Sequence, residues 1–256
     1  MIHIKDLKKK YDGNEVLKGL NLSVETGETV AILGRSGVGK SVLLRLIIGI
    51  EKPDSGFVEV DGVKISDLQK SELYAAVKHM GMLFQGAALF DSMTIEDNIA
   101  FYLKQHGNPE TKKPYKPSEI KDLVAEALKK VGLENVEKKM PSDLSGGMRK
   151  RAGLARLIVY RPKILLYDEP TTGLDPITAQ QINELIVQIQ NELENTTSIV
   201  VTHDVHSALY ISDRLALHSG GLIAYVAKPD DFFEIDDPTI SFLKDHLSHH
   251  PRADKS

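Results

Sequence analysis

Alternating and continuous apolar segments predict several strands in the first third of the chain. Residues 1–33 have the pattern of strands, in which apolar and polar positions alternate before the unbroken apolar segment Thr29–Leu33. Alternation is typical of a strand with one buried face, whereas a continuous apolar segment is typical of a strand buried on both faces. Residues 57–65 predict a hairpin that turns at Asp61-Gly62.

Apolar residues at helical spacing predict three helices. The first covers residues 43–48, the second residues 120–131 and the third residues 182–193. For the second helix, Ser118 is the expected N-cap and Gly132 the expected C-terminal stop.

Two further apolar strands, at residues 164–167 and 198–201, flank the third helix. Strand–helix–strand order implies a parallel sheet with helices on its faces. Residues 95–160 look different and are expected to be mainly helical. They include a polar, proline-rich stretch that we interpret as an exposed loop. The alternative is a basic ligand site, which four lysines would form: Lys104, Lys112, Lys113 and Lys116.

Composition places the chain among ordinary globular proteins. Hydrophobic residues make up 41% and charged residues 27% of its 256 residues, and cysteine is absent. The net charge of −4 gives no basic excess, so nucleic acid is not an expected partner. No apolar run approaches the roughly 20 residues of a membrane span, and the N-terminus lacks the apolar core of a secretion signal. We therefore expect a cytosolic protein that a partner holds at any membrane on which it acts.

A glycine-rich segment between a predicted strand and a predicted helix carries the first chemical signal. Its sequence fits the P-loop pattern G-x-x-x-x-G-K followed by Ser or Thr: Gly34-Arg35-Ser36-Gly37-Val38-Gly39-Lys40-Ser41. The glycines let backbone N–H groups point at phosphate oxygens. Lys40 is expected to reach the β- and γ-phosphates of ATP, and the Ser41 hydroxyl to bind Mg²⁺. A chance match has odds of about one in a hundred in such a chain, so nucleotide binding is favoured.

Two carboxylates follow the apolar strand at residues 164–167. At the end of such a strand, Asp168 is expected to bind Mg²⁺ directly or through water. Glu169 is expected to face the γ-phosphate and to orient or deprotonate the attacking water. A solvated turn is the alternative, but a buried strand in a chain with a P-loop favours the functional interpretation.

A second glycine-containing segment precedes a helix rich in arginine and lysine. Its sequence is Leu144-Ser145-Gly146-Gly147-Met148. A serine and two glycines at a helix start form an anion cradle, although a simple capped helix is the alternative. Since one nucleotide needs one cradle, the second is expected to serve the nucleotide of another subunit. This predicts a head-to-tail dimer with ATP between the two copies.

The order of these three motifs resembles that of the ABC ATPase superfamily. The resemblance implies an α/β P-loop NTPase cassette: a mainly parallel RecA-like sheet flanked by helices, an antiparallel β subdomain and an α-helical subdomain. It implies one ABC ATPase domain at residues 1–228, with the core and β subdomain at about 1–94 and 161–228 and the helical subdomain at about 95–160. Residues 229–256 are then a C-terminal extension with a disordered end.

The resemblance also implies roles for single residues. Tyr11 resembles the aromatic residue that stacks on adenine, a core or surface tyrosine being the alternative. Gln85 resembles the Q-loop glutamine, which contacts Mg²⁺ and the lytic water and links the site to the membrane subunit. Asp175 resembles the D-loop aspartate at the dimer interface, and His203 resembles the switch histidine that contacts the γ-phosphate.

Three positions depart from the family pattern without removing a reacting group. Met148 stands where many relatives have Gln, Val42 stands where Ser or Thr is usual, and Arg35 adds charge at the rim of the loop. A lost hydrogen bond costs about 0.5–1.5 kcal/mol net, which is too little to abolish binding. All three positions therefore remain in the predicted nucleotide site, and a competent ATPase is expected.

Within the superfamily, the sequence resembles the ATPases of Mla-type (maintenance of lipid asymmetry) phospholipid transporters at Leu83–Thr94, Asp175–Thr178 and Met148. This implies an ATPase subunit at the cytoplasmic face of the bacterial inner membrane that drives phospholipid or a related hydrophobic molecule between the two membranes. Implied partners are a second copy, permease subunits and a mammalian-cell-entry-domain protein. An importer or exporter of another substrate, such as an amino acid, is the first alternative, and a soluble ABC ATPase acting on ribosomes or DNA is the second.

Overall fold

The computed structural model of the chain describes residues 1–108, 111–193 and 195–248. They divide into unit 1, which comprises Met1–Leu73 and the residues from Ile199 onward, and unit 2, which comprises Tyr74–Ser198. The end of the chain that we predict to be disordered, residues 249–256, lies outside the described residues.

An antiparallel sheet in unit 1 has the strand order β2-β1-β4-β5. Its strands are β1 (Ile2–Tyr11), β2 (Asn14–Val24), β4 (Ser55–Val60) and β5 (Val63–Lys64). Alternate residues of β2 are buried from Leu20 to Val24, which confirms the predicted pattern. The hairpin turn is also confirmed, because Asp61 and Gly62 have φ of 49° and 80°, as a tight hairpin needs. The predicted strand is one residue too long, since Ile65 is buried in the 3₁₀ helix η1 (Ile65–Asp67).

The other strands of unit 1 have the order β10-β9-β3-β8. They are β3 (Thr29–Leu33), β8 (Thr197–Thr202, which begins in unit 2), β9 (Arg214–Ser219) and β10 (Leu222–Ala227). All of β3 is buried, as its unbroken apolar sequence predicts, and it pairs in parallel with β9. The helices are α1 (Lys40–Ile47), α7 (Val205–Ile211), α8 (Pro229–Phe232) and α9 (Pro238–Ser248), and α2 (Lys70–Val77) spans the boundary between the units.

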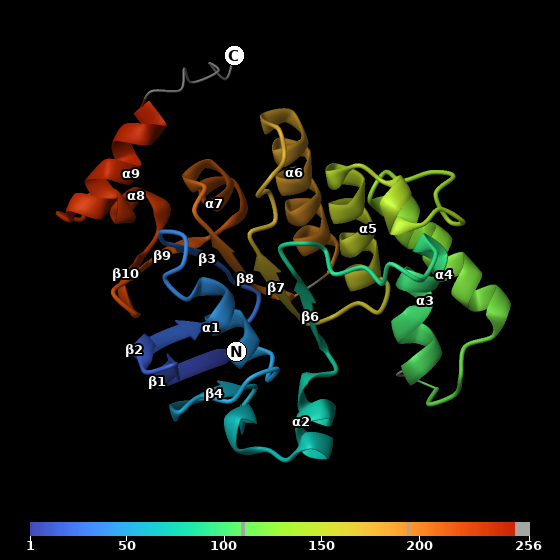
Figure 1. Ribbon diagram of the computed structural model, residues 1–256, viewed down its shortest axis with the longest axis horizontal. Helices are drawn as coiled ribbons and strands as arrows, with labels where there is room; N and C mark the ends of the chain where they lie inside the picture. Colours follow the sequence, from blue (N-terminus) through green and yellow to red (C-terminus); the bar gives the residue numbers. More distant parts are fainter. Residues whose placement is uncertain (109–110, 194, 249–256) are drawn as a thin grey trace. The chain divides into compact units, whose positions relative to one another are not determined.

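In unit 2, helix α5 is the central helix (Figure 1), in contact with α3, α4, α6 and β6. The elements are β6 (Met80–Leu83), α3 (Ile95–His106), α4 (Pro117–Lys130), η2 (Pro141–Asp143), α5 (Gly146–Ile158), β7 (Ile164–Asp168) and α6 (Pro176–Glu192). Strands β6 and β7 pair in parallel. The predicted strands at 164–167 and 198–201 and the helix between them are therefore confirmed.

The second predicted helix begins two residues earlier than its expected N-cap implies, because its N-cap is Lys116 instead of Ser118. Ser118 is not its N-cap, because Pro117 occupies the first turn of α4 and the backbone N–H of Lys116 donates to Glu119 at 2.7 Å. Gly132 is confirmed as the stop signal, with φ of 64°. Lys104, which we assigned to the neighbouring loop, instead lies in the last turn of α3.

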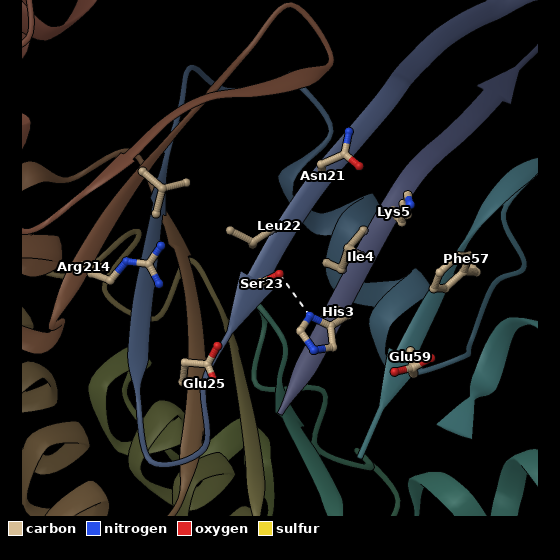
Figure 2. A pocket seen from close by; sticks show the side chains of 11 residues that line it. His3, Ile4, Lys5, Asn21, Leu22, Ser23, Glu25, Phe57, Glu59 and Arg214 are labelled. Atoms are coloured by element: carbon tan, nitrogen blue, oxygen red, sulfur yellow. Dashed lines mark hydrogen bonds between the residues drawn. The ribbon is translucent and has the colours of Figure 1, made fainter. Parts of the chain in front are cut away.

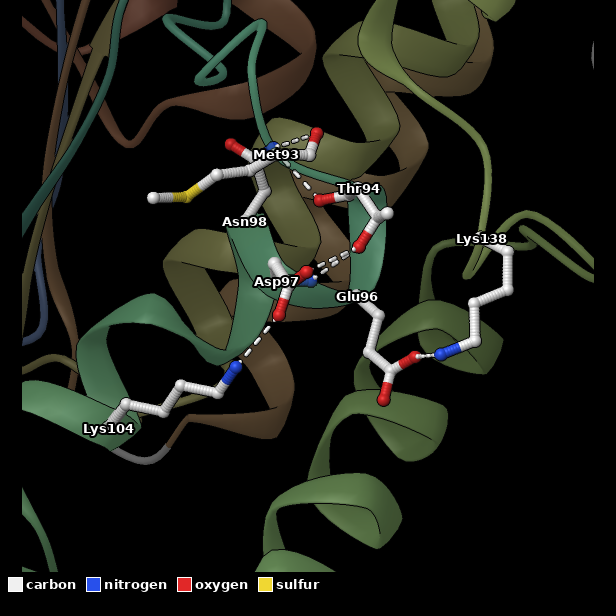
Figure 3. A network of polar contacts seen from close by, with 7 residues as sticks. All are labelled: Met93, Thr94, Glu96, Asp97, Asn98, Lys104 and Lys138. Carbon is white, nitrogen blue, oxygen red and sulfur yellow. Dashed lines mark hydrogen bonds and ion pairs between the residues drawn. The ribbon is translucent and has the colours of Figure 1, made fainter.

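Helix α3 starts from a compact polar network (Figure 3). The hydroxyl of Thr94 caps the helix by accepting from the N–H of Asp97 at 3.2 Å, and Asp97 pairs with Lys104 at 2.8 Å. The fully buried side chain of Asn98 accepts from the N–H of Phe90 at 2.7 Å and donates to three backbone carbonyl oxygens. This single amide therefore organises the loop between β6 and α3. Across the described ranges, no helix has both the length and the apolar character to cross a membrane.

Candidate functional site

The P-loop of unit 1 joins the buried strand β3 to helix α1. Gly37 and Gly39 have φ of 81° and 106°, values that strain any residue with a Cβ. A Cβ at Gly39 would lie 2.6 Å from Cγ1 of Val16, and a Cβ at Gly34 would lie 2.8 Å from the carbonyl oxygen of His218. Only glycine lets the loop curl against the segments behind it, which produces the cradle that a phosphate needs.

Lys40 lies inside this cradle. It is 5% exposed, and its Nζ donates to the carbonyl oxygens of Gly34 at 2.7 Å and Arg35 at 3.1 Å. The ammonium is thus fixed at the N-terminal end of α1, where the helix dipole adds positive potential. Since residues 35–37 are exposed, the loop is accessible to a phosphate group.

Gly34, Arg35 and His203 line one hollow of about 460 Å³ in unit 1. His203 follows β8 and is exposed, so the structure brings the predicted switch histidine to the P-loop. Part of the lining comes from α9, through Pro238, Thr239, Phe242 and Leu243. No motif in the sequence marks this helix of the C-terminal extension as a neighbour of the P-loop.

Tyr11 ends β1 and is 37% exposed. Its hydroxyl donates to the carboxylate of Glu51, which also accepts from Nε of Arg45 at 2.5 Å. Burial raises the pKa of Tyr11, and the hydrogen bond to Glu51 raises it further. Because Arg45 belongs to α1, the tyrosine ring is tied to the helix that follows the P-loop. Sequence reasoning missed Glu51 and Arg45, which no motif distinguishes from surface charges.

Asp168 and Glu169 lie at the C-terminal end of β7 in unit 2 and are 5% and 8% exposed. Glu169 has φ of 47°, a left-handed conformation that costs free energy for a residue with a side chain. Thr172 Oγ1 donates to Oε2 of Glu169 at 3.0 Å, and its backbone N–H donates to the Glu169 carbonyl at 3.3 Å. Both acids are therefore buried, and Glu169 is also held by hydrogen bonds, unlike the side chains of a solvated turn.

The predicted second cradle lies at the start of α5. Ser145 is exposed and caps the helix, its Oγ accepting from the N–H of Met148 at 3.3 Å. The hydroxyl keeps its own proton for donation, so capping is compatible with binding an anion. A Cβ at Gly147 would lie 2.6 Å from Cγ2 of Thr178, so glycine permits close packing against α6. Gly146 and Gly147 are both partly exposed.

Asp175 is exposed and forms the N-cap of α6. Its carboxylate accepts from the N–H of Thr178 at 3.0 Å and from the Thr178 hydroxyl at 2.6 Å. These hydrogen bonds hold the pKa of Asp175 below its ordinary value. The side chain thus has a structural task in its own chain that the sequence resemblance does not specify.

Gln85 is exposed just after β6, beside a strained backbone segment. Ala87 and Ala88 have φ of 62° and 47°, which is unusual for consecutive alanines. Arg156 of α5 donates to their carbonyl oxygens at 2.9 and 2.6 Å. The guanidinium therefore fixes the loop that carries Gln85, a role that no sequence motif indicates.

The proposed Mg²⁺ ligands suit a hard cation. Ser41, Gln85 and Asp168 offer a hydroxyl, an amide oxygen and a buried carboxylate, and Mg²⁺ prefers oxygen ligands while retaining several waters. Over the described ranges, no group of three or more His, Cys, Asp or Glu residues is arranged to hold a metal. Ser41 belongs to unit 1, whereas Gln85 and Asp168 belong to unit 2.

A larger hollow, of about 630 Å³, lies on the antiparallel sheet of unit 1 (Figure 2). Side chains of β1, β2 and β4 line it, and Nδ1 of His3 lies 3.0 Å from Oγ of Ser23. None of the predicted nucleotide-binding residues lines this hollow. Of these two hollows, only the smaller one is lined by P-loop residues, Gly34 and Arg35.

Comparisons with known proteins agree with these motifs. The profile of a family described as ABC transporter matches residues 17–172. The chain is 44% identical over 214 residues to the intermembrane phospholipid transport system ATP-binding protein MlaF of Haemophilus influenzae, covering 83% of this chain and 78% of that protein. It is 43% identical over 216 residues to the probable ribonucleotide transport ATP-binding protein mkl of Mycobacterium leprae, covering 84% of this chain and 60% of that protein.

The chain therefore spans only about 60% of the length of the mycobacterial relative. Among solved structures, a dimeric post-hydrolysis state of the ATP-binding cassette MJ0796 bound to ADP and Pi matches with a TM-score of 0.80 and 31% identity. That match covers 89% of this chain and 98% of the other. The cassette fold expected from the sequence is thereby confirmed.

Proposed function

The chain belongs to the ABC transporter family, and on that premise we propose that it is the ATP-binding and ATP-hydrolysing subunit of a membrane transporter. The observation that carries this proposal is the P-loop, in which Gly34 and Gly39 leave no room for a side chain and the Lys40 ammonium is already held inside the loop. Such a preorganised cradle suits the triphosphate of a nucleotide.

In the proposed reaction, Lys40 and the P-loop N–H groups bind the β- and γ-phosphates, while Tyr11 stacks on adenine. Glu169 accepts a proton from the water that attacks the γ-phosphate, and His203 donates a hydrogen bond to a γ-phosphate oxygen. Ser41, Gln85 and Asp168 would hold Mg²⁺, which neutralises phosphate charge when it is bound. The burial and fixed conformation of Glu169 support its role, because a base must be positioned before the water arrives.

A second copy of the chain completes each site in this proposal. Ser145 and Gly147 of one copy bind the γ-phosphate held by the other copy, with Met148 and Asp175 nearby at the interface. The exposed serine at the start of α5 supports this arrangement. Hydrolysis removes the shared phosphate, so the closed dimer opens, and ATP drives closure by binding the closed state more tightly than ADP does.

The substitution Glu169→Gln tests the catalytic proposal. Glu169→Gln should retain ATP binding, lower kcat by at least a hundredfold and accumulate an ATP-bound dimer in size-exclusion chromatography. Glu134→Gln, an exposed glutamate of the same unit, is the matched control and should behave like the wild type. Normal turnover by Glu169→Gln would refute the assignment of the base.

Ser145→Arg separates the partner's contribution from the chain's own site. It should abolish ATPase activity while the affinity of the monomer for ATP stays within twofold, because Ser145 serves the other copy's nucleotide. An equal loss of ATP affinity in the monomer would contradict a site shared between two copies.

We further infer that the transported substrate is a phospholipid or a related hydrophobic molecule. The similarity to MlaF supports this, together with Met148 and the segment Leu83–Thr94. Partners would be permease subunits at the cytoplasmic face of the inner membrane and a mammalian-cell-entry-domain protein. The similarity to mkl favours a second candidate, a transporter of another substrate class.

Purification of the tagged chain from detergent-solubilised membranes distinguishes the two candidates. The lipid proposal predicts a copurified permease with a mammalian-cell-entry-domain protein and bound phospholipid, identified by mass spectrometry. Copurification with a binding protein for a water-soluble substrate would contradict it. An untagged strain taken through the same steps is the control.

A further inference from the structure

Lys150 is a buried lysine of α5 that the proposed mechanism does not use. It is 5% exposed, and its Nζ donates to the backbone carbonyl oxygen of Glu169 at 3.1 Å. The ammonium group of a lysine is ordinarily exposed to solvent, and lysines are almost never fully buried unless they are paired. A buried ammonium directed at the backbone of the proposed base therefore points to a specific task.

The surroundings of this ammonium act on its pKa in opposite directions. Burial lowers the pKa of Lys150 to about 8, and the negative charges of Asp168 and Glu169 oppose that decrease. A group with such a pKa remains mostly charged at neutral pH. The contact with Glu169 is thus a charge-assisted hydrogen bond, which is stronger than a bond between neutral groups.

The acceptor of this hydrogen bond is a strained residue. Glu169 adopts φ of 47°, and its carbonyl oxygen also accepts from the N–H of Thr172 at 3.3 Å. A left-handed glutamate persists only where the surroundings impose that conformation. Lys150 lies 19 residues before Glu169, in the preceding helix α5, so it provides a restraint that the local turn does not contain.

We propose that Lys150 is a positioning residue for Glu169, which holds the backbone of the base in its left-handed conformation and ties it to helix α5. This inference rests on the proposed function, in which Glu169 is the general base. It adds a connection within one chain between the helix that meets the partner's nucleotide and the base that acts on the chain's own nucleotide.

Ser145 and Lys150 lie close to each other along α5. Lys150 follows Ser145 by five residues, which corresponds to about 7.5 Å along the axis at ~1.5 Å per residue. A helix of this length moves as a rigid element, so a displacement of α5 when Ser145 engages a phosphate also displaces the ammonium at Glu169. Binding of one copy's nucleotide to Ser145 would thereby change the position of Glu169 at the other nucleotide.

The substitution Lys150→Met tests the proposal, because methionine keeps an unbranched side chain but removes the charge and the donor. We expect kcat to fall at least tenfold, while KM for ATP and the affinity for a fluorescent ATP analogue stay within twofold. Lys129→Met, at an exposed lysine of α4, is the matched control and should keep wild-type kcat. Circular dichroism and the melting temperature establish that each variant is folded.

A second variant keeps the test decisive if methionine disturbs folding. Lys150→Gln retains an N–H donor without the charge, so its kcat should lie between those of the wild type and Lys150→Met. In the Glu169→Gln background, Lys150→Met should lower the residual rate by less than twofold, because the two residues serve one step.

The proposal is overturned if Lys150→Met keeps kcat within twofold of the wild type, or if KM rises in proportion to the fall in kcat. The outcome for Glu169→Gln separates this inference from the proposed function. If that variant is inactive while Lys150→Met is fully active, only the positioning role fails. If Glu169→Gln turns over normally, the base assignment itself fails.

Discussion

Acidification should destabilise the protein through a single buried histidine behind the P-loop. His218 lies in β9 and is 1% exposed, and within the described residues neither of its ring nitrogens has a hydrogen-bond partner. Burial, followed by the positive charge of Lys40, lowers the pKa of His218 from 6.5 to about 4. The folded state therefore requires a neutral imidazole at this position.

The size of the effect follows from the two pKa values. Between pH 4 and pH 6.5 the unfolded chain binds more protons than the folded chain, so stability is complete above pH 6.5 and is lost as the pH falls toward 4. The shift corresponds to a maximum loss of about 3 kcal/mol. Between pH 7 and pH 5 the expected loss from this one group is about 2 kcal/mol.

Urea unfolding of the nucleotide-free protein at pH 7 and pH 5 measures this loss. The variant His218→Leu removes the titrating group, so the wild type should lose about 2 kcal/mol more than the variant over that interval. His206→Leu, at an exposed histidine, is the control and should keep the wild-type pH response. Equal losses in the wild type and His218→Leu would refute the reasoning, because other titrating groups are common to both proteins.

Three further substitutions test hydrogen bonds that the structure shows and the sequence does not predict. Asn98→Ala should lower the free energy of urea unfolding by about 2–4 kcal/mol, because it removes the acceptor of the Phe90 N–H and one hydrogen bond to each of three carbonyl oxygens; a loss below about 1 kcal/mol would contradict this. Arg156→Lys should speed amide hydrogen exchange at residues 86–89, since lysine lacks the forked donors that hold Ala87 and Ala88; unchanged exchange would remove the proposed restraint. Glu51→Ala should weaken ATP and ADP binding about 3–10-fold in equilibrium titrations with kcat unchanged, because Tyr11 loses its hydrogen bond; unaltered affinities would argue against a role for this contact.

The elements that sequence analysis predicted correctly are those set by short-range patterns. The buried strand β3 is determined by its unbroken apolar sequence, and the turn of the P-loop by its glycines. In both cases consecutive residues determine the local structure. Helix α3 was not predicted individually, although Ile95, Ile99 and Leu103 recur at intervals of four after a capping threonine. The cap and this spacing are local signals of a helix, which the polar, proline-rich segment after it lacks.

Contacts between distant segments could not be predicted in the same way. Tyr11 meets Glu51 across 40 residues, and Arg156 meets Ala88 across 68. Nothing in the composition near Glu51 distinguishes it from a solvated surface charge, because its partner is selected by how β1 and α1 pack. The proposed reacting groups are therefore predictions from motifs, whereas the contacts that hold them became visible only in the folded chain.

The basic side chains of α5 have a role in the structure that their sequence does not indicate. A run of arginine and lysine ordinarily indicates a solvated face or a site for an anion. Here four of these side chains donate to backbone carbonyl oxygens: Arg149 to Leu144, Lys150 to Glu169, Arg151 to Val131, and Arg156 to Ala87 and Ala88. The helix is thus joined to its own preceding turn, to Glu169, to the end of α4 and to the loop that carries Gln85. In the proposed function, a phosphate bound at the start of this helix and a permease that displaces the Gln85 loop would therefore both act on Glu169 through the same element.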